Sequence, residues 1–144
     1  MKIIEFEDKY RDDMIFMILE AKNALGRVPG LNLDLLDIQS NYIAKGDMFW
    51  LAIDDNGRVI GSVGYSTNDN EKDVTLHRLF VKYNLKRQGI GTALLNTAEK
   101  YIQSQNKSTI FLNLGIGKEW FESRAFYNKN GYIEYEPNKM MKFL

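Results

Sequence analysis

The chain has 144 residues, 44% of them hydrophobic, which is enough for one compact domain with a sizeable core but leaves little room for a second. Lysine and arginine together number 19, as do aspartate and glutamate, so no overall field favours nucleic acid or an anionic membrane. There is no cysteine, which excludes disulfides, thiolate metal sites and a cysteine nucleophile. We expect one domain over residues 1–144 with a small or overall neutral partner.

The beginning of the chain argues against a targeting segment. The stretch MKIIEFEDKYRDDM is charged throughout, unlike a signal peptide. No apolar run approaches the ~18 residues needed to span a bilayer. We therefore expect a cytoplasmic protein that does not associate with membranes.

The first third of the chain predicts a strand followed by helices. Residues 2–6 have strand-like content, and residues 10–26 repeat apolar side chains at helical spacing. Pro29 and Gly30 then break the helix. A helical pattern resumes over residues 33–46, where the closing glycine stops it.

The middle of the chain predicts a β-hairpin and a third strand. The apolar runs 48–53 and 59–65 are joined by DDNGR, and an Asn-Gly pair between such runs is the strongest short hairpin signal. A polar loop over residues 66–73 leads to a strand over residues 74–81, which is rich in β-branched and aromatic residues.

The last part of the chain predicts two more helices and three more strands. Residues 91–102 place apolar side chains on one stripe of a helix, residues 108–116 return to a strand, and residues 118–131 predict a short helix closed by Gly131. The final pair of predicted strands covers residues 132–137 and 139–144. The sum is an α+β domain on one mixed sheet with helices on both faces.

The loop LKRQGIGTALL, residues 85–95, connects a strand to a helix and predicts an anion site. The backbone N–H groups of residues 87–92 have no intrahelical partner, and the helix N-terminus adds partial positive charge. Gly89 and Gly91 allow close approach of the backbone and positive φ, while Lys86 and Arg87 can add charge at the rim. The loop is therefore predicted to hold a phosphate or pyrophosphate.

Other interpretations of this loop fit less well. A Walker A loop needs Gly-Lys-Ser/Thr, whereas Gly91 is followed by Thr92 and Ala93. A Rossmann fingerprint needs a third glycine where this chain has Leu94. A tight strand-to-helix turn that binds nothing is the remaining alternative, and the loop alone does not decide against it.

Two motifs together resemble one family. The stretch LHRLFVKYNLKRQGIGTALLNTAEKY resembles motif A of the GNAT acetyltransferase superfamily, and RAFYNKNGY, Arg124 to Tyr132, resembles its motif B. They occur in the family's order and at the family's separation. The resemblance implies a GNAT-like fold, with a mixed, mostly antiparallel β-sheet flanked by helices on both faces.

The resemblance also implies a cofactor and site residues. The co-substrate would be acetyl-CoA, with no metal, and the motif B tyrosine, Tyr127, would be the general acid near the thioester sulfur. The strand before the loop would pair with the pantetheine arm through Leu79, Phe80 and Val81. The amides that would hold the pyrophosphate belong to Arg87, Gln88, Gly89, Ile90, Gly91 and Thr92.

This chain departs from the family pattern at three points. Lys86 stands where Arg or Gln is usual, which keeps the charge but loses the planar bidentate geometry. Trp120 replaces an Asn that contacts the cofactor in many members. The stretch STIFLNLGIG holds no counterpart of the glutamate that serves as base in some members, so the base is not identified.

Other polar residues suggest weaker roles. His77, the only histidine, could relay the amine proton through water, although a partly exposed strand residue is the preferred interpretation. Glu5, Glu20, Asp34 and Asp37 could attract a cationic substrate, although solvated faces are the preferred interpretation. By resemblance the segment RVPGLNL would border the acceptor site, and its Arg27 weakly favours an acidic acceptor.

The predicted function is acetyl-CoA-dependent transfer of an acetyl group to a primary amine of a small molecule, peptide or protein. That chemistry needs a neutral amine, a hydrogen-bond donor for the oxyanion and a proton for the thiolate. The resemblance suggests a backbone N–H near Leu79 or Phe80 as the oxyanion donor. The alternative is a non-catalytic acyl-CoA-binding or regulatory module of the same fold. A homodimer could form through an exposed edge of the C-terminal strand pair.

Overall fold

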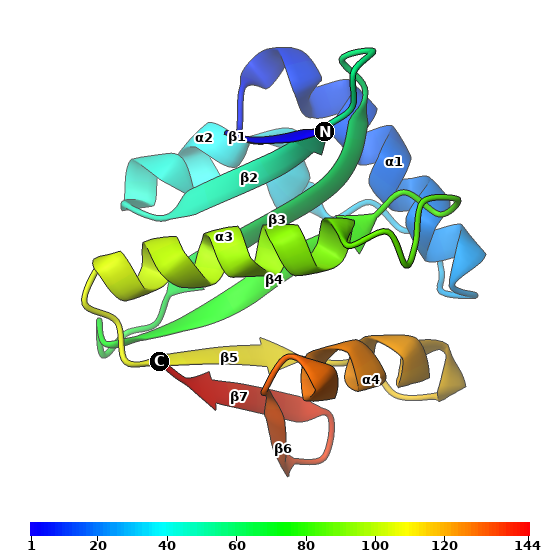
Figure 1. The fold of residues 1–144 in the computed structure, drawn as a ribbon. Helices are drawn as coiled ribbons and strands as arrows, with labels where there is room; N and C mark the ends of the chain where they lie inside the picture. Colours follow the sequence, from blue (N-terminus) through cyan, green and yellow to red (C-terminus); the bar gives the residue numbers. More distant parts are fainter.

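The computed structural model describes residues 1–144 and contains one seven-stranded sheet (Figure 1). The strand order is β1-β2-β3-β4-β5-β7-β6, and every neighbouring pair is antiparallel except β4–β5. The predicted mixed, mostly antiparallel sheet is confirmed. The strands are β1 (Lys2–Glu5), β2 (Met48–Ile53), β3 (Val59–Thr67), β4 (Asp73–Val81), β5 (Thr109–Asn113), β6 (Ile133–Glu136) and β7 (Lys139–Phe143).

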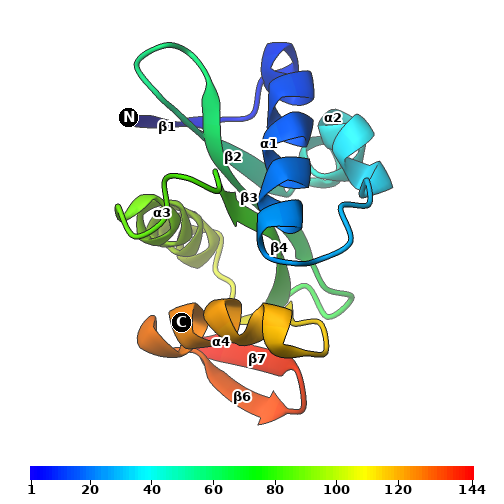
Figure 2. The same ribbon diagram turned by 90° about the vertical axis from the view of Figure 1, so that its right-hand side faces the viewer.

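Helices cover both faces of this sheet, as the sequence predicts (Figure 2). The α-helices are α1 (Arg11–Ala24), α2 (Ile38–Asn41), α3 (Ile90–Ser104) and α4 (Phe121–Lys129). Helices α1 and α2 pack on one face and α3 and α4 on the other, each pair around its own hydrophobic cluster. None of the helices combines the length and apolar character needed to cross a membrane.

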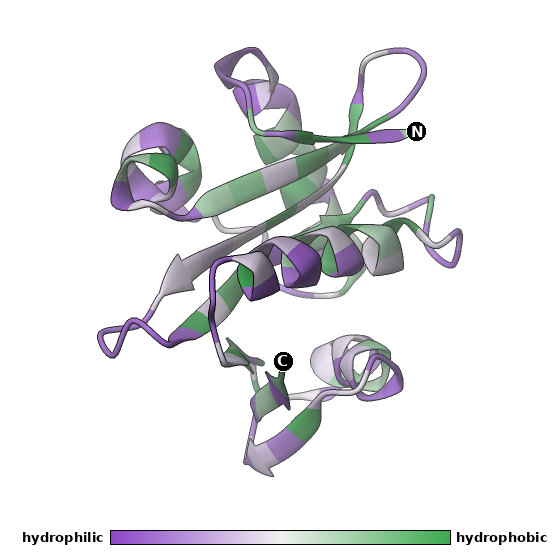
Figure 3. Cartoon of the chain, turned by 60° about the vertical axis from the view of Figure 1, so that its left-hand side comes forward, coloured by the Kyte–Doolittle hydropathy of each residue, from purple (hydrophilic) through white to green (hydrophobic).

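The two clusters arise from the alternation of side chains along the strands. In β2, Trp50 and Ala52 belong to the larger cluster under α3, while Phe49, Leu51 and Ile53 belong to the smaller one under α1. A strand buried on both faces is apolar at every position, which explains the unbroken run MFWLAI. Hydrophobic residues concentrate in the central strands and hydrophilic ones in the connecting loops (Figure 3).

The segment 33–46 is helical only in short pieces, whereas the sequence predicted one continuous pattern. A 3-10 turn (Leu33–Leu36), the single turn α2 and a second 3-10 turn (Ile43–Lys45) follow one another. Asp37 interrupts the helical backbone, because its φ of −146° and ψ of 80° lie outside the helical region. Its side chain accepts a hydrogen bond from the Ser40 N–H and so caps the start of α2. Gly46, at φ 88°, ends the segment as predicted.

Strands β4 and β5 diverge after a short parallel contact. They pair only from Asp73 to Thr75, opposite Thr109 to Phe111. Beyond that point β4 continues to Val81 with β3 on one side and no strand on the other. The exposed edge of β4 leads directly into the loop before α3, so the fold opens the sheet where the sequence predicts the cofactor site (Figure 1).

Candidate active site

The loop between β4 and α3 presents a run of unpaired backbone donors. Helix α3 begins at Ile90, its N-cap is Gly89, and no side chain caps it. The first amide of this region to donate a backbone hydrogen bond is that of Ala93, to the Gly89 carbonyl at 2.9 Å, and none of the N–H groups from Lys86 to Thr92 donates one. Amides gathered at the positive end of a helix dipole favour an anion.

The two glycines of the loop have different roles. Gly89 has φ 83°, and a Cβ built there would meet no atom within 4 Å, so this position borders open space. Gly91 does not adopt the positive φ that a glycine allows, and a Cβ there would lie 3.4 Å from Phe126 and 3.5 Å from Val81. The second left-handed residue of the loop is Arg87, at φ 64°. A Cβ at Gly91 would thus make ordinary van der Waals contacts with α4 and with the end of β4.

Of the two basic residues at the rim of the loop, Lys86 forms an ion pair and Arg87 forms none. The Lys86 ammonium lies 3.0 Å from a carboxylate oxygen of Glu122 on α4, and this ion pair compensates its charge. Arg87, Gln88 and Thr92 are exposed, whereas the Ile90 side chain is buried in the core. Ile90 can thus offer a ligand only its backbone.

A β-bulge interrupts β4 just before the loop. Ser62 pairs with Phe80 and Gly64 with His77, so Val63 stands opposite two residues, Arg78 and Leu79. Arg78 has φ 57°, and its carbonyl accepts a hydrogen bond from the Ser62 hydroxyl at 2.7 Å. The bulge therefore leaves Arg78 and Leu79 outside the regular pairing of β4 with β3.

The side chains that follow the bulge anchor β4 on both faces. Leu79 and Val81 pack on the cluster beneath α3, and Phe80 packs on the cluster beneath α1. All three are half-buried. Their backbone therefore lies along the open edge of β4 while their side chains hold that edge in place.

Tyr127 lies on α4 within an aromatic group. Its ring makes edge contacts with Phe126 and Tyr132, at centroid distances of 5.2 and 5.4 Å, and its side chain is only 9% exposed. Its hydroxyl forms no hydrogen bond with another residue, and the oxygen keeps some contact with solvent. Burial raises the pKa of Tyr127 well above its ordinary value, and the nearby Arg27 opposes this only in part. The hydroxyl is thus protonated and available as a donor.

Helix α4 connects the loop at β4 with the segment that follows α1. On one side it contacts that loop through Phe126, next to Gly91, and Glu122, paired with Lys86. On the other side Ser123 accepts a hydrogen bond from Arg27 Nη2 at 2.8 Å. Seen toward this end of the molecule, α1, α3 and α4 surround the end of β4 (Figure 2).

Trp120, which stands where many family members carry an Asn, packs against Gly115 and Arg27. Its indole fills the space above Gly115, where any Cβ would lie 2.2 Å from the ring. The guanidinium carbon of Arg27 lies 3.4 Å from the centroid of the same ring, a close cation–π contact. Trp120 therefore holds Arg27 beside α4. The two residues are far apart in the sequence, and the sequence analysis did not predict this contact.

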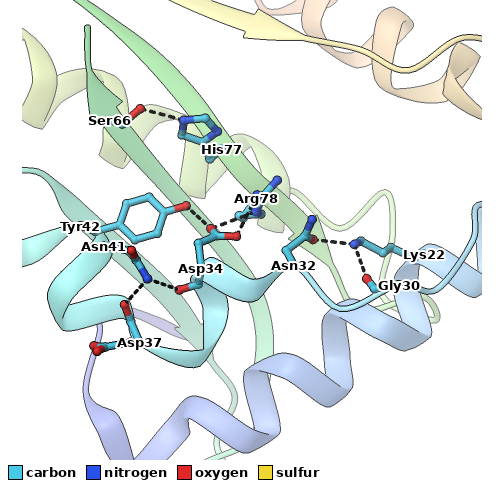
Figure 4. A network of polar contacts seen from close by, with 10 residues as sticks. All are labelled: Lys22, Gly30, Asn32, Asp34, Asp37, Asn41, Tyr42, Ser66, His77 and Arg78. Atoms are coloured by element: carbon cyan, nitrogen blue, oxygen red, sulfur yellow. Dashed lines mark hydrogen bonds and ion pairs between the residues drawn. The ribbon is translucent and has the colours of Figure 1, made fainter. Parts of the chain in front are cut away.

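A polar network ties the segment after α1 to the bulge of β4 (Figure 4). Asp34 accepts two hydrogen bonds from Arg78, from Nη2 at 2.9 Å and Nε at 3.2 Å, and a third from the Tyr42 hydroxyl at 2.5 Å. Burial alone would raise the pKa of Asp34, but these bonds outweigh it and hold that pKa below its ordinary value. The prediction of a solvated Asp34 is wrong, because this carboxylate neutralises the residue that forms the bulge.

His77 lies next to this network. Its Nε2 is 2.8 Å from the Ser66 hydroxyl, and its ring faces Tyr42 at a centroid distance of 6.3 Å (Figure 4). Burial, helped by the charge of Arg78, lowers the pKa of His77, so the imidazole is neutral at neutral pH. No group of His, Cys, Asp or Glu side chains is placed to hold a metal ion.

Comparison with curated proteins finds N-acetyltransferases. Human N-acetyltransferase 8 is 32% identical over 104 residues, covering 69% of this chain and 44% of that protein. N-acetylaspartate synthetase of Xenopus tropicalis is 31% identical over 110 residues, covering 73% of this chain and 40% of that protein. The chain thus spans less than half the length of these relatives.

Solved structures share the whole fold. An acetyltransferase of the GNAT family from Staphylococcus aureus Mu50 superposes with a TM-score of 0.86 at 26% identity, covering 99% of this chain and 98% of that one. The PaiA N-acetyltransferase of Thermoplasma acidophilum, solved in complex with coenzyme A, superposes with a TM-score of 0.77 at 19% identity over 99% of this chain and 98% of that one. A model of the acetyltransferase (GNAT) family matches residues 13–132. The chain belongs to the GNAT acetyltransferase family.

Proposed function

We propose that this chain is an acetyl-CoA-dependent N-acetyltransferase, which moves the acetyl group from the thioester to a primary amine by direct attack. The observation that carries the proposal is the run of N–H groups from Lys86 to Thr92, none of which donates a hydrogen bond, at the end of the open edge of β4. Membership of the GNAT family supports it independently.

The loop and strand fit the two ends of the cofactor. In the proposal the amides of Arg87, Gln88, Gly89, Ile90, Gly91 and Thr92 hold the pyrophosphate of acetyl-CoA. Open space beside Gly89 supports this, because phosphate oxygens must come close to the backbone to accept hydrogen bonds. The pantetheine arm would pair along the backbone of Leu79, Phe80 and Val81, the part of β4 that has no neighbouring strand on that side.

The chemical step needs a donor for the oxyanion and a proton for the leaving group. A backbone N–H near Leu79 or Phe80, next to the bulge that interrupts the pairing with β3, would stabilise the oxyanion. The amine nitrogen bonds to the acetyl carbon, the C–S bond breaks, and Tyr127 donates toward the departing sulfur. Its raised pKa keeps the hydroxyl protonated, although it makes complete proton transfer less favourable.

The amine proton has no assigned acceptor. His77 is neutral and could take it through water, but its hydrogen bond to Ser66 and its place beside Tyr42 are equally consistent with a packing role. We propose direct attack by an already neutral amine, with solvent receiving the proton.

A non-catalytic acyl-CoA-binding module is the second candidate, favoured by Trp120 in place of the usual Asn. The two functions are separated by following CoA release from acetyl-CoA across a panel of amines. An enzyme gives amine-stimulated release in equal amount with an N-acetylated product. Binding of acetyl-CoA without stimulated release by any acceptor supports the module.

The names of related proteins do not select an acceptor. N-acetylaspartate synthetase is named for an amino acid product, whereas a structure with a TM-score of 0.72 at 18% identity is an aminoglycoside 6′-N-acetyltransferase in complex with coenzyme A. The proposed reaction uses no metal. A cytoplasmic location and a homodimer through β6 stay predictions, the second resting on the exposed apolar residues Ile133 and Tyr135 of that edge strand.

A further inference from the structure

Arg27 has an unusual environment for an arginine. Its guanidinium carbon lies 3.4 Å from the centroid of the Trp120 ring, and Nη2 donates to the uncharged Ser123 hydroxyl at 2.8 Å. Its Nε is the one buried side-chain nitrogen or oxygen of the molecule without a hydrogen-bond partner. Leaving a buried donor of a charged group unpaired costs at least as much as a lost hydrogen bond, so an acceptor oxygen brought to Arg27 by a ligand would remove this cost.

Lys22, near the end of α1, is a second cation without a carboxylate partner. Its ammonium donates to the Gly30 carbonyl at 2.7 Å and the Asn32 side-chain oxygen at 2.5 Å, both uncharged (Figure 4). It also lies 5.9 Å from the centroid of the Phe80 ring. The Arg27 N–H donates to the Lys22 carbonyl at 3.0 Å, so the two residues are neighbours. The Lys22 ammonium thus lies near Phe80, in the part of β4 that follows the bulge.

The nearby carboxylates do not neutralise these two charges. Asp34 is engaged by Arg78 in a two-bond ion pair, and Glu122 is paired with Lys86. Glu119 is the other carboxylate whose charge reaches Arg27, and it forms no ion pair with it. Burial and the charge of Arg78 lower the pKa of Lys22, and Asp34 opposes this only in part.

We propose that Arg27 and Lys22 bind a carboxylate of the acceptor, so that the substrate is a small amine carrying a carboxylate, as amino acids do. This inference rests on the proposed function and places the acceptor between Phe80 on β4 and Tyr127 on α4. A guanidinium suits a carboxylate because it offers two parallel N–H donors. The amine forms the new C–N bond, the thioester C–S bond breaks, the thiolate takes up a proton and the nitrogen releases one, giving an N-acetyl amino acid and CoA.

The test compares acceptors that differ only in the carboxylate: alanine with alaninamide, and phenylalanine with phenylalaninamide. The amides have the less basic amine, so more of it is neutral and chemistry alone favours them. We expect the acids nevertheless to show at least tenfold higher kcat/KM. Equal or better turnover of the amides by the unmodified protein overturns the inference and leaves the acetyltransferase proposal standing.

Variants then assign the preference to its residues. Arg27→Gln and Lys22→Met should each raise KM for the acids at least tenfold and leave KM for the amides unchanged, whereas Arg27→Lys, which keeps the charge, should retain part of the preference. Arg11→Gln is the matched control, because Arg11 pairs with Asp12 at the opposite end of α1. Melting temperature and CoA affinity report on folding. An equal loss for acids and amides in a folded Arg27→Gln protein contradicts the inference.

A binding measurement separates failure of the two proposals. N-acetylphenylalanine and its amide are titrated calorimetrically into the CoA-bound protein. If no amine is acetylated but the acid binds more tightly and Arg27→Gln abolishes the difference, the carboxylate site stands and the acetyltransferase proposal fails. If the acid has no advantage in binding either, the carboxylate site is refuted.

Discussion

Gly89 allows the loop proposal to be tested against a control with the same backbone. Gly89 has φ 83° and ψ 3°, and Gly46, at the end of the 3-10 turn Ile43–Lys45, has φ 88° and ψ 7°. A Cβ at either position would meet nothing within 4 Å. Replacing either glycine by alanine therefore adds the same left-handed strain and no clash.

The expected stability effects are equal. A left-handed conformation costs a residue with a Cβ roughly 1–2 kcal/mol, which corresponds to a fall in Tm of about 3–6 °C in a chain of this size. The expected binding effects differ, because only the Gly89 methyl stands beside the amides proposed for the pyrophosphate. Loss of one hydrogen bond to a charged group, at about 1.5–3 kcal/mol, weakens affinity roughly tenfold to 150-fold.

Calorimetric titration of CoA into both variants, with Tm measured in parallel, gives the answer. We expect Gly89→Ala to lose affinity and Gly46→Ala to keep that of the unmodified protein. Unchanged CoA affinity in a folded Gly89→Ala protein would refute the assignment of the loop. An equal loss in both variants would show that the effect is strain and not contact.

Three further predictions concern side chains of the site. Tyr127→Phe should lower kcat by ~10²–10⁴-fold with little change in acetyl-CoA affinity or Tm, because its hydroxyl has no protein partner. The control Tyr132→Phe loses a hydrogen bond to Glu99 and should lower stability without lowering kcat. If Tyr127→Phe keeps full kcat when chemistry limits the rate, Tyr127 is not the general acid. Lys86→Ala should weaken CoA less than about fivefold, because an exposed ion pair is worth about 0–1 kcal/mol and is screened by salt; a loss of several hundredfold would contradict this. Folding lowers the pKa of His77, so its contribution to stability is present above the unfolded pKa of about 6.5 and is lost as the pH falls toward the folded pKa. The fall in Tm from pH 7.5 to 5.5 should therefore be smaller in His77→Gln than in the unmodified protein. An identical fall in both proteins would disprove this linkage.

Features set by local sequence were predicted well. The Asn-Gly pair at Gly57, the alternation within the strands and the glycine that begins α3 each act over a few residues, and the corresponding elements are confirmed. The segment 33–46 was predicted less well because its helical spacing concealed the break at Asp37, where a side-chain cap competes with the helix.

Features that depend on distant contacts could not be predicted. The bulge has a positive φ at Arg78, where no glycine in the sequence indicates one. Arg78 is held there by an ion pair with Asp34, which is far away in the sequence. Likewise, the spacing of the sequence gives no sign that Arg27 lies on Trp120. Tertiary contacts of this kind decide which charges are compensated, and so they decide the chemistry of the acceptor side of the site.

The most direct test of the central claim follows the backbone amides of an isotope-labelled protein by NMR during titration with CoA and with pantetheine. The pyrophosphate is present only in CoA. We predict that CoA shifts the amide signals of residues 87–92 strongly, and that saturating pantetheine perturbs Leu79 to Val81 while leaving the loop amides nearly unchanged. Saturation with CoA that leaves the amides of residues 87–92 unmoved would contradict the account.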